Sequence, residues 1–216
     1  MDWDRACAEL REYGRLCVER RLVAGSAGNI SLRLDEQEFV ISRRGARLDR
    51  LEPGDLVRCA LDGETWVGDV RPSTETPMHR AIYQVQPEAQ AILHTSPFYT
   101  TLVACSDIEL RVDLTPEGMA YLNNVGRVPY LHPGTVELAQ AARREAVHNV
   151  IILDNHGLLV WSRTLDEALL VSEMMERHCQ TLVFARLGEG AFHLHWLGEA
   201  VQRDFERLRY ARRAAH

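Results

Sequence analysis

Three potential metal ligands in this chain of 216 residues constrain its fold, because a fold that uses them must bring distant segments together. They are Glu75, His94 and His156, and each lies at the edge of a short apolar or turn segment. Neutral imidazole nitrogens and ionised carboxylates are the commonest donors to divalent metals in proteins. The trio therefore predicts a divalent metal site assembled from three separate parts of the sequence.

The length and charge of the chain limit its class. With 46% hydrophobic residues the chain can bury a sizeable core, and we expect one domain over residues 1–216. The formal net charge of −6 argues against a nucleic-acid partner, and the Arg-rich residues 203–213 are typical of the solvated face of a terminal helix. No apolar run approaches the roughly 20 residues that span a bilayer, so no membrane partner is expected.

The cysteines indicate a reducing environment. Five cysteines are scattered without the close spacing of a metal-binding motif: Cys7, Cys17, Cys59, Cys105 and Cys179. The first residues, from Asp2 onward, do not resemble a signal peptide. We therefore expect a cytoplasmic protein.

A helix and an antiparallel meander are predicted for the first third of the chain. Apolar residues three and four apart, from Trp3 to Cys17, predict an amphipathic helix. Asp2 is expected to cap this helix, which should end near Gly25. Alternating apolar and polar residues then predict three strands, Asn29–Arg33, Glu38–Ser42 and 55–61.

Helices and strands alternate in the remainder. Thr76-Pro77 and Ser96-Pro97 are each expected to start a helix, with the first residue as its cap, because proline is tolerated at the first helical position. A further helix is expected from Thr135 and a long one over 165–186. The predicted strands here are 91–93, Val150–Leu153 and 158–161. These elements predict an α/β fold of three layers, α/β/α, with a central, largely antiparallel sheet.

Seven segments of the chain follow one another in the order found in a known family. They are Ala27-Gly28-Asn29-Ile30-Ser31, Val40-Ile41-Ser42 through Gly45, Arg71-Pro72-Ser73-Thr74-Glu75, Met78-His79-Arg80-Ala81-Ile82-Tyr83, Ala91-Ile92-Leu93-His94-Thr95, Pro129-Tyr130 with Pro133-Gly134-Thr135, and Asn155-His156-Gly157. With these segments the chain resembles the class II aldolase/adducin family, which includes L-fuculose-1-phosphate aldolase and L-ribulose-5-phosphate 4-epimerase. Such a resemblance specifies the fold strongly and the substrate much less.

The resemblance implies the chemistry of the metal site. In such aldolases three histidines hold a zinc ion, which polarises a ketose phosphate so that the carbanion left by carbon–carbon cleavage is stabilised as an enediolate. His94 and His156 match two of these ligands. Glu75 matches the carboxylate near the metal that shuttles the proton. Ser96 stands where the family has its third histidine.

Ser96 leaves three alternatives open. As a helix cap worth about 1 kcal/mol, it would leave a site made of His94, His156, Glu75 and water. The same two imidazoles and one carboxylate, with open positions, would suit Fe²⁺ or Mn²⁺ as well as the expected Zn²⁺. In the third alternative the protein has lost activity and keeps the fold as a non-catalytic, adducin-like scaffold.

The resemblance also implies a site for a substrate phosphate. The matching positions, with backbone N–H groups and small hydroxyls, are Gly28, Asn29, Gly45, Ser73 and Thr74. Arg43 and Arg44 add charge where the family more often has a proline and a small polar residue. If one of them points inward, with Arg44 as our candidate, the substrate carries a carboxylate or a differently placed phosphate. If both point outward, they form a solvated hairpin tip.

Two other histidine features are interpreted structurally. His79, four residues after Glu75, is expected to form hydrogen bonds behind the site without binding the metal. His193 and His195, the one surviving His-any-His pair, are expected on a surface strand.

Together these residues predict a metal-dependent aldolase-type lyase that acts on a small phosphorylated sugar or hydroxy-acid. Decarboxylation, dehydration and epimerisation are alternatives, because all proceed through a metal-bound enolate or aldol intermediate. Family members commonly form C4 tetramers, so we expect a homotetramer, which would also bury exposed strand edges. Each site would borrow residues from the adjacent subunit, either from residues 115–121 or from the C-terminal tail.

Overall fold

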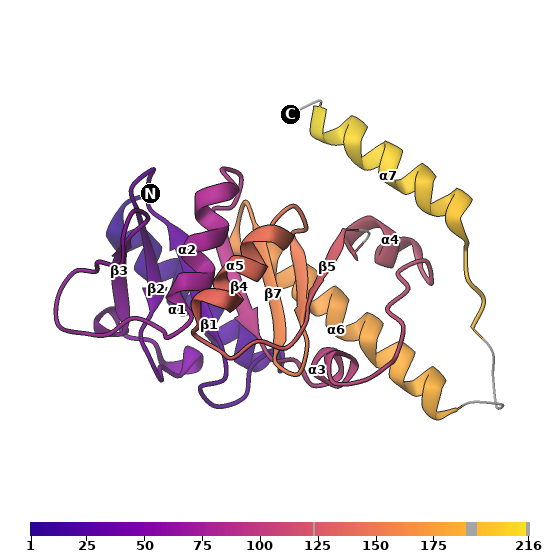
Figure 1. Cartoon of the computed structure of the whole chain (residues 1–216), viewed down its shortest axis with the longest axis horizontal. Coiled ribbons are helices and arrows are strands. Elements are labelled where there is room, and N and C mark those ends of the chain that lie inside the picture. Colours follow the sequence, from indigo (N-terminus) through magenta and orange to yellow (C-terminus); the bar gives the residue numbers. More distant parts are fainter. Residues whose placement is uncertain (123, 189–193, 215–216) are drawn as a thin grey trace.

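The computed structural model describes residues 1–122, 124–188 and 194–214 and contains a seven-stranded sheet (Figure 1). The strands follow the spatial order β3-β2-β1-β4-β7-β6-β5. Their bounds are β1 Asn29–Arg33, β2 Glu38–Ser42, β3 Leu56–Ala60, β4 Ala91–Thr95, β5 Val125–Val128, β6 Val150–Leu153 and β7 Gly157–Ser162. Neighbouring strands are antiparallel except β5 with β6. The predicted, largely antiparallel sheet is therefore confirmed.

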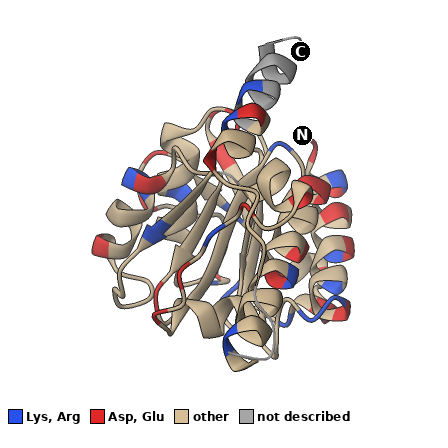
Figure 2. Ribbon diagram, turned by 90° about the vertical axis from the view of Figure 1, so that its right-hand side faces the viewer, with Lys and Arg blue, Asp and Glu red and all other residues tan. Residues whose placement is uncertain are grey.

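Helices cover both faces of this sheet, as Figure 2 shows. Their bounds are α1 Trp3–Glu19, α2 Thr76–Val85, α3 Phe98–Ala104, α4 Pro116–Leu122, α5 Val136–Glu145, α6 Leu165–Leu187 and α7 Glu199–Ala214. Side chains of α1, α3 and α6 pack on one face of the sheet, and those of α2 and α5 on the other. The fold has the three layers, α/β/α, that the sequence predicts.

Alternation along β4 assigns side chains to the two faces. Ala91 and Leu93 point into the core shared with α1 and α6, whereas Ile92 points into the core shared with α2 and α5. The next residue in this alternation, His94, therefore belongs to the α2 side of the sheet. β6 is buried at every position because both of its faces are covered.

Several predicted helix ends are confirmed. The Asp2 carboxylate accepts a hydrogen bond from the backbone N–H of Asp4 at 3.0 Å, and the Thr135 hydroxyl accepts one from Leu138 at 3.2 Å. The long helix predicted over 165–186 is α6, and residues 203–213 lie in α7. In contrast, α1 ends at Glu19, before the predicted Gly25, since the chain turns through a left-handed φ of 59° at Arg21.

The predicted cap at Thr76 is wrong by one residue. Thr76 is the first residue of α2, and Glu75 occupies the N-cap position without a capping side-chain hydrogen bond. The Thr76 hydroxyl instead donates to the Ser73 carbonyl at 2.6 Å. Because Glu75 forms no capping hydrogen bond, its carboxylate can point away from the helix.

The predicted cap at Ser96 is also wrong. Pro97 occupies the N-cap position of α3, and the Ser96 hydroxyl donates to the Ala27 carbonyl at 3.0 Å. The first turn of α3 is capped from α6, where the Glu176 carboxylate accepts from the backbone N–H groups of Tyr99 at 2.9 Å and Thr100 at 2.8 Å. Ser96 is therefore not a helix cap.

Of these α-helices and strands, α4 and β5 were not predicted. β5 is only four residues long and contains Gly126, so its sequence carries little strand signal.

All five cysteines are free. No described helix is long and apolar enough to cross a membrane.

Candidate metal centre

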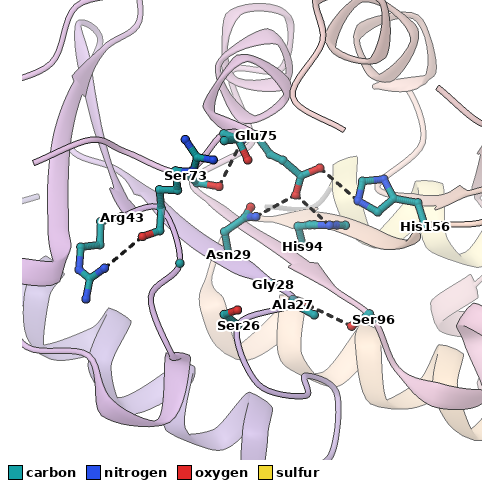
Figure 3. A pocket seen from close by; sticks show the side chains of 13 residues that line it. Ser26, Ala27, Gly28, Asn29, Arg43, Ser73, Glu75, His94, Ser96 and His156 are labelled. Atoms are coloured by element: carbon teal, nitrogen blue, oxygen red, sulfur yellow. Dashed lines mark hydrogen bonds and ion pairs between the residues drawn. The ribbon is translucent and has the colours of Figure 1, made fainter. Parts of the chain in front are cut away.

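The three predicted ligands meet at one end of β4, as Figure 3 shows. Glu75 precedes α2, His94 lies on β4, and His156 lies in the turn between β6 and β7. Nε2 of His94 is 3.0 Å from Oε2 of Glu75, and Nε2 of His156 is 3.2 Å from Oε1 of the same carboxylate. One candidate donor atom from each residue lies within 4.8 Å of the others. The cluster can therefore hold a metal ion.

The order of strands brings these residues together. β4 lies between β1 and β7, so His94 has Asn29 and Leu159 as its neighbours across the sheet. His156 directly precedes β7, where a left-handed Asn155, with φ of 55°, turns the chain. Gly157 must be a glycine, because a Cβ there would lie 2.5 Å from the carbonyl oxygen of Thr95. This close contact holds the His156 turn against the end of β4.

A hydrogen bond fixes the tautomer of His94. Its Nδ1 lies 3.0 Å from the carbonyl oxygen of Leu158 and donates to it, since a carbonyl only accepts. When the ring is neutral, as a metal ligand must be, its Nε2 lone pair faces Oε2 of Glu75, which already accepts from the Asn29 amide at 2.9 Å. Two acceptors that face each other need a proton or a cation between them. This donor set therefore fits a divalent cation.

The charges of the cluster depend on one another. Burial opposes ionisation of Glu75, but the neighbouring His94 and His156 outweigh it and hold the pKa of the carboxyl well below its usual range. Burial lowers the pKa of His94, but the Glu75 carboxylate outweighs this effect and raises it overall. Glu75 is consequently an anion at neutral pH. An ionised carboxylate beside two imidazoles supplies the ligand charge that a divalent cation requires.

A cavity of about 160 Å³ opens beside the three ligands. Its lining includes all the predicted substrate residues, Gly28, Asn29, Arg44, Gly45, Ser73 and Thr74. It also includes Ser26 and Ala27, which sequence reasoning missed because a small residue in a loop carries little signal. The Asn29 amide is engaged by Glu75, so binding of phosphate by Asn29 stays a prediction.

Arg43 and Arg44 both line the cavity but differ in their partners. Nε of Arg43 lies 2.5 Å from Oδ1 of Asp55, and its guanidinium also donates to the Arg44 carbonyl at 3.1 Å. Within residues 1–122, 124–188 and 194–214, the guanidinium of Arg44 has no hydrogen bond or ion pair. Arg44 is thus the cation available to a ligand.

The sequence profile of the Class II Aldolase and Adducin N-terminal domain matches residues 8–183. This chain belongs to that family. The resemblance seen in the seven segments is therefore confirmed.

This chain is similar to proteins that are named for different activities. It is 33% identical over 171 residues to an L-fuculose phosphate aldolase of Methanococcus vannielii, covering 78% of this chain and 92% of that protein. It is 32% identical over 200 residues to a 3-oxo-tetronate 4-phosphate decarboxylase of Escherichia coli, covering 90% and 92%. The crystal structure of a putative aldolase/epimerase/decarboxylase from Klebsiella pneumoniae aligns with a TM-score of 0.85 and 29% identity, covering 95% of this chain and 99% of that one.

Ser96 departs from the three-histidine pattern expected of class II aldolases. It lines the cavity, but its hydroxyl donates to the Ala27 carbonyl. Apart from Glu75, His94 and His156, the described part of the chain has no group of three His, Cys, Asp or Glu side chains that could hold a metal. The donors present are two imidazoles and one carboxylate, the set that both metal-binding alternatives share, and the identity of the metal stays a prediction.

The other predicted histidines lie outside this cluster. His79 is fully buried one turn after Glu75, with Nδ1 2.7 Å from the Ser31 hydroxyl, so it forms a hydrogen bond as expected, and a role behind the metal site stays a prediction. Burial, together with the nearby charge of His94, lowers the pKa of His79 to about 3. His193 lies outside the described residues, and His195 is exposed in a segment that is not a strand, contrary to the prediction.

Proposed function

We propose that this protein is a metal-dependent carbon–carbon lyase of the aldolase type, acting on a small phosphorylated sugar or hydroxy-acid. The observation that carries the proposal is the Glu75 carboxylate, held between two imidazoles at the wall of a polar cavity. A carboxylate in this position can bind a cation with one oxygen and move a proton with the other. Both tasks are needed to cleave the bond between the α and β carbons of a β-hydroxy carbonyl compound, since the β-hydroxyl loses its proton as the enolate forms.

His94, His156 and Glu75 would hold the cation, which we expect to be Zn²⁺, with Mn²⁺ and Fe²⁺ as alternatives. When bound, such a cation polarises substrate oxygens and stabilises the negative charge that develops as the bond breaks. Asn29 keeps Oε2 of Glu75 turned toward His94. Oε1 faces His156 and is the oxygen that we assign to proton transfer.

The rest of the cavity lining suits an anion. Ser73 accepts a hydrogen bond from the Glu75 N–H at 3.2 Å, so its own hydroxyl proton can be donated to a ligand. Thr74 and Gly45 line the same cavity and add neutral donors. Arg44 supplies a full positive charge beside them. This combination supports a substrate with a phosphate, a carboxylate or both.

The direct test is a screen of ketose phosphates and aldonic-acid phosphates with product masses as the readout, in the presence of Zn²⁺, Mn²⁺ or Fe²⁺. The proposal predicts cleavage products with at least one substrate and none with Glu75→Gln. If no substrate reacts with any metal, the scaffold alternative gains support. In that case a thermal shift with inorganic phosphate should also fail to depend on metal.

Decarboxylation is the second candidate. It is favoured by the similarity to the Escherichia coli decarboxylase, which extends over 200 residues, whereas that to the Methanococcus vannielii aldolase extends over 171. The free charge of Arg44 suits a substrate acid equally well. Release of carbon dioxide from a 3-oxo acid phosphate, without aldehyde products, would decide for this reaction.

We also expect the protein to form a homotetramer in the cytoplasm. Large apolar side chains are exposed on α3 and α6, where Phe98 is 70% exposed, Phe184 52% and Leu187 77%. Exposed apolar groups of this size are typical of association surfaces. Light scattering at micromolar concentration checks the mass, and an active monomer would contradict the expectation.

A further inference from the structure

A ladder of polar side chains connects β1 with α2. Its three rungs are Asn29 with Glu75, Ser31 with His79, and Arg33 with Tyr83. Alternate residues of a strand share one face, and residues four apart share one face of a helix. Two residues advance about 6.6 Å along a strand, and four residues advance about 6 Å along a helix axis. These similar distances keep successive rungs side by side. We call these six side chains the polar ladder.

The middle of the polar ladder is closed to solvent. Ser31 and His79 are 0% exposed and Tyr83 is 2% exposed. The Ser31 hydroxyl lies 2.7 Å from Nδ1 of His79 and 2.8 Å from the Tyr83 hydroxyl. At the far rung, the Arg33 guanidinium stacks over the Tyr83 ring, 4.9 Å from its centroid. The three buried side chains therefore form one hydrogen-bonded unit.

The direction of these hydrogen bonds follows from counting donors. Among the residues described, Ser31 is the one partner of the Tyr83 hydroxyl, and a buried hydroxyl without an acceptor is costly. Tyr83 therefore donates to Ser31, and Ser31 donates to Nδ1 of His79. A neutral His79 then carries its proton on Nε2.

Two buried polar atoms on adjacent rungs of the polar ladder lack a partner in the described chain. Nε2 of His79 and Oδ1 of Asn29 are both buried, and neither has a hydrogen-bond partner in the described chain. One is then a donor and the other an acceptor on adjacent rungs, and one water molecule can bridge such a pair. The amide nitrogen of Asn29 donates to Glu75. With a water molecule at that one place, the donors would run in one direction, from Tyr83 through Ser31, His79 and Asn29 to the Glu75 carboxylate.

We propose that Ser31, His79 and Tyr83 are positioning residues that hold the Asn29 amide, and through it the Glu75 carboxylate, in the orientation that the metal centre requires. This inference depends on the proposed function only where it predicts an effect on catalysis. Removal of a group that orients a metal ligand in this way typically lowers metal affinity or activity by about 10- to 100-fold.

Ser31→Ala tests the proposal with Ser172→Ala as the matched control. Ser172 is also a fully buried serine, and its hydroxyl donates to the Ala168 carbonyl in α6 at 2.7 Å. Ser31→Ala is expected to weaken Zn²⁺ binding about tenfold in competition with a chromogenic chelator, and to lower kcat with little change in KM. Ser172→Ala should leave both unchanged. Equal effects of the two variants would overturn the proposal.

Two variants of His79 separate positioning from packing. His79→Gln places an amide near the position of Nε2, whereas His79→Asn places one near Nδ1. The proposal predicts that the glutamine variant keeps more of the wild-type Zn²⁺ affinity. A better result with asparagine would contradict it.

Imidazole ¹⁵N NMR of the metal-free protein gives a readout that needs no substrate. His79 is expected to be neutral with its proton on Nε2, and Tyr83→Phe should alter that signal. A proton on Nδ1 would overturn the proposal even if the enzyme is active. If no substrate reacts, the proposed function fails, while the NMR signal and the Zn²⁺ titration still decide this inference.

Discussion

Gly157 packs directly against the carbonyl oxygen of Thr95, and this contact joins the start of β7 to the end of β4 beside the two histidines. A Cβ at residue 157 would lie 2.5 Å from that oxygen, well inside van der Waals contact. Because the obstructing atom belongs to the backbone, it cannot rotate away. The spacing between His94 and His156 therefore depends on a residue without a side chain.

Gly157→Ala should thus damage both the fold and the site. We expect a loss of about 1–3 kcal/mol in the free energy of unfolding, together with weaker metal binding. Urea unfolding and a Zn²⁺ titration measure the two effects. Gly54→Ala is the control, since a Cβ there meets nothing within 4 Å. Equal stabilities of the two variants would show that the contact is not as close as described.

The Glu176 carboxylate should stabilise α3. Glu176→Gln removes its charge while keeping its shape, and we expect a loss of about 1–2 kcal/mol because hydrogen bonds to a charged group are stronger than neutral ones. Glu173→Gln in the same helix removes a partly exposed ion pair to Arg20 and should cost at most about 1 kcal/mol. Thermal unfolding of both variants compares the two. A smaller loss for Glu176→Gln than for Glu173→Gln would argue against this cap.

The buried His79 should make the metal-free protein less stable in acid. Its pKa is about 3 in the folded chain against an ordinary value of 6.5, so between these values the unfolded chain binds more protons. Stability from this group is complete above pH 6.5 and falls as the pH drops toward 3, by about 1.4 kcal/mol per pH unit. Urea unfolding between pH 7 and pH 4.5 measures the slope. His79→Gln should show a shallower slope, and an unchanged slope would contradict the assignment.

Arg44 and Arg43 should respond differently to the same substitution. Arg44→Gln removes the free charge from the cavity and should raise KM for an anionic substrate about tenfold, with little loss of stability. Arg43→Gln breaks the ion pair with Asp55 and should change KM much less. Steady-state kinetics on both variants test this. A larger rise in KM for Arg43→Gln would reverse the roles.

Local sequence signals predicted most of the fold. Strands β1, β2 and β6 have the predicted bounds, and Asp2 and Thr135 cap their helices, because alternation and capping act over a few residues. The Ser96 cap failed for the opposite reason. Its role is taken by Glu176, a residue of α6, which only the tertiary structure brings to α3.

The candidate site was predicted in part. Glu75, His94 and His156 were placed together by residue type and resemblance, and the structure brings their side chains into contact. The sequence could not predict the hydrogen bond from Asn29 to Glu75 or the hydrogen-bonded unit of Ser31, His79 and Tyr83. Both depend on the register between a strand and a helix. The same holds for the difference between Arg43 and Arg44, which the position of Asp55 decides.

The central claim is that Glu75, His94 and His156 bind a metal ion, and metal analysis of protein purified without chelator tests it most directly. The account predicts roughly one equivalent of a divalent transition metal per chain, and a loss of most of it in His156→Ala. Less than about a tenth of an equivalent in the wild-type protein, not restored by added Zn²⁺, Mn²⁺ or Fe²⁺, would contradict it.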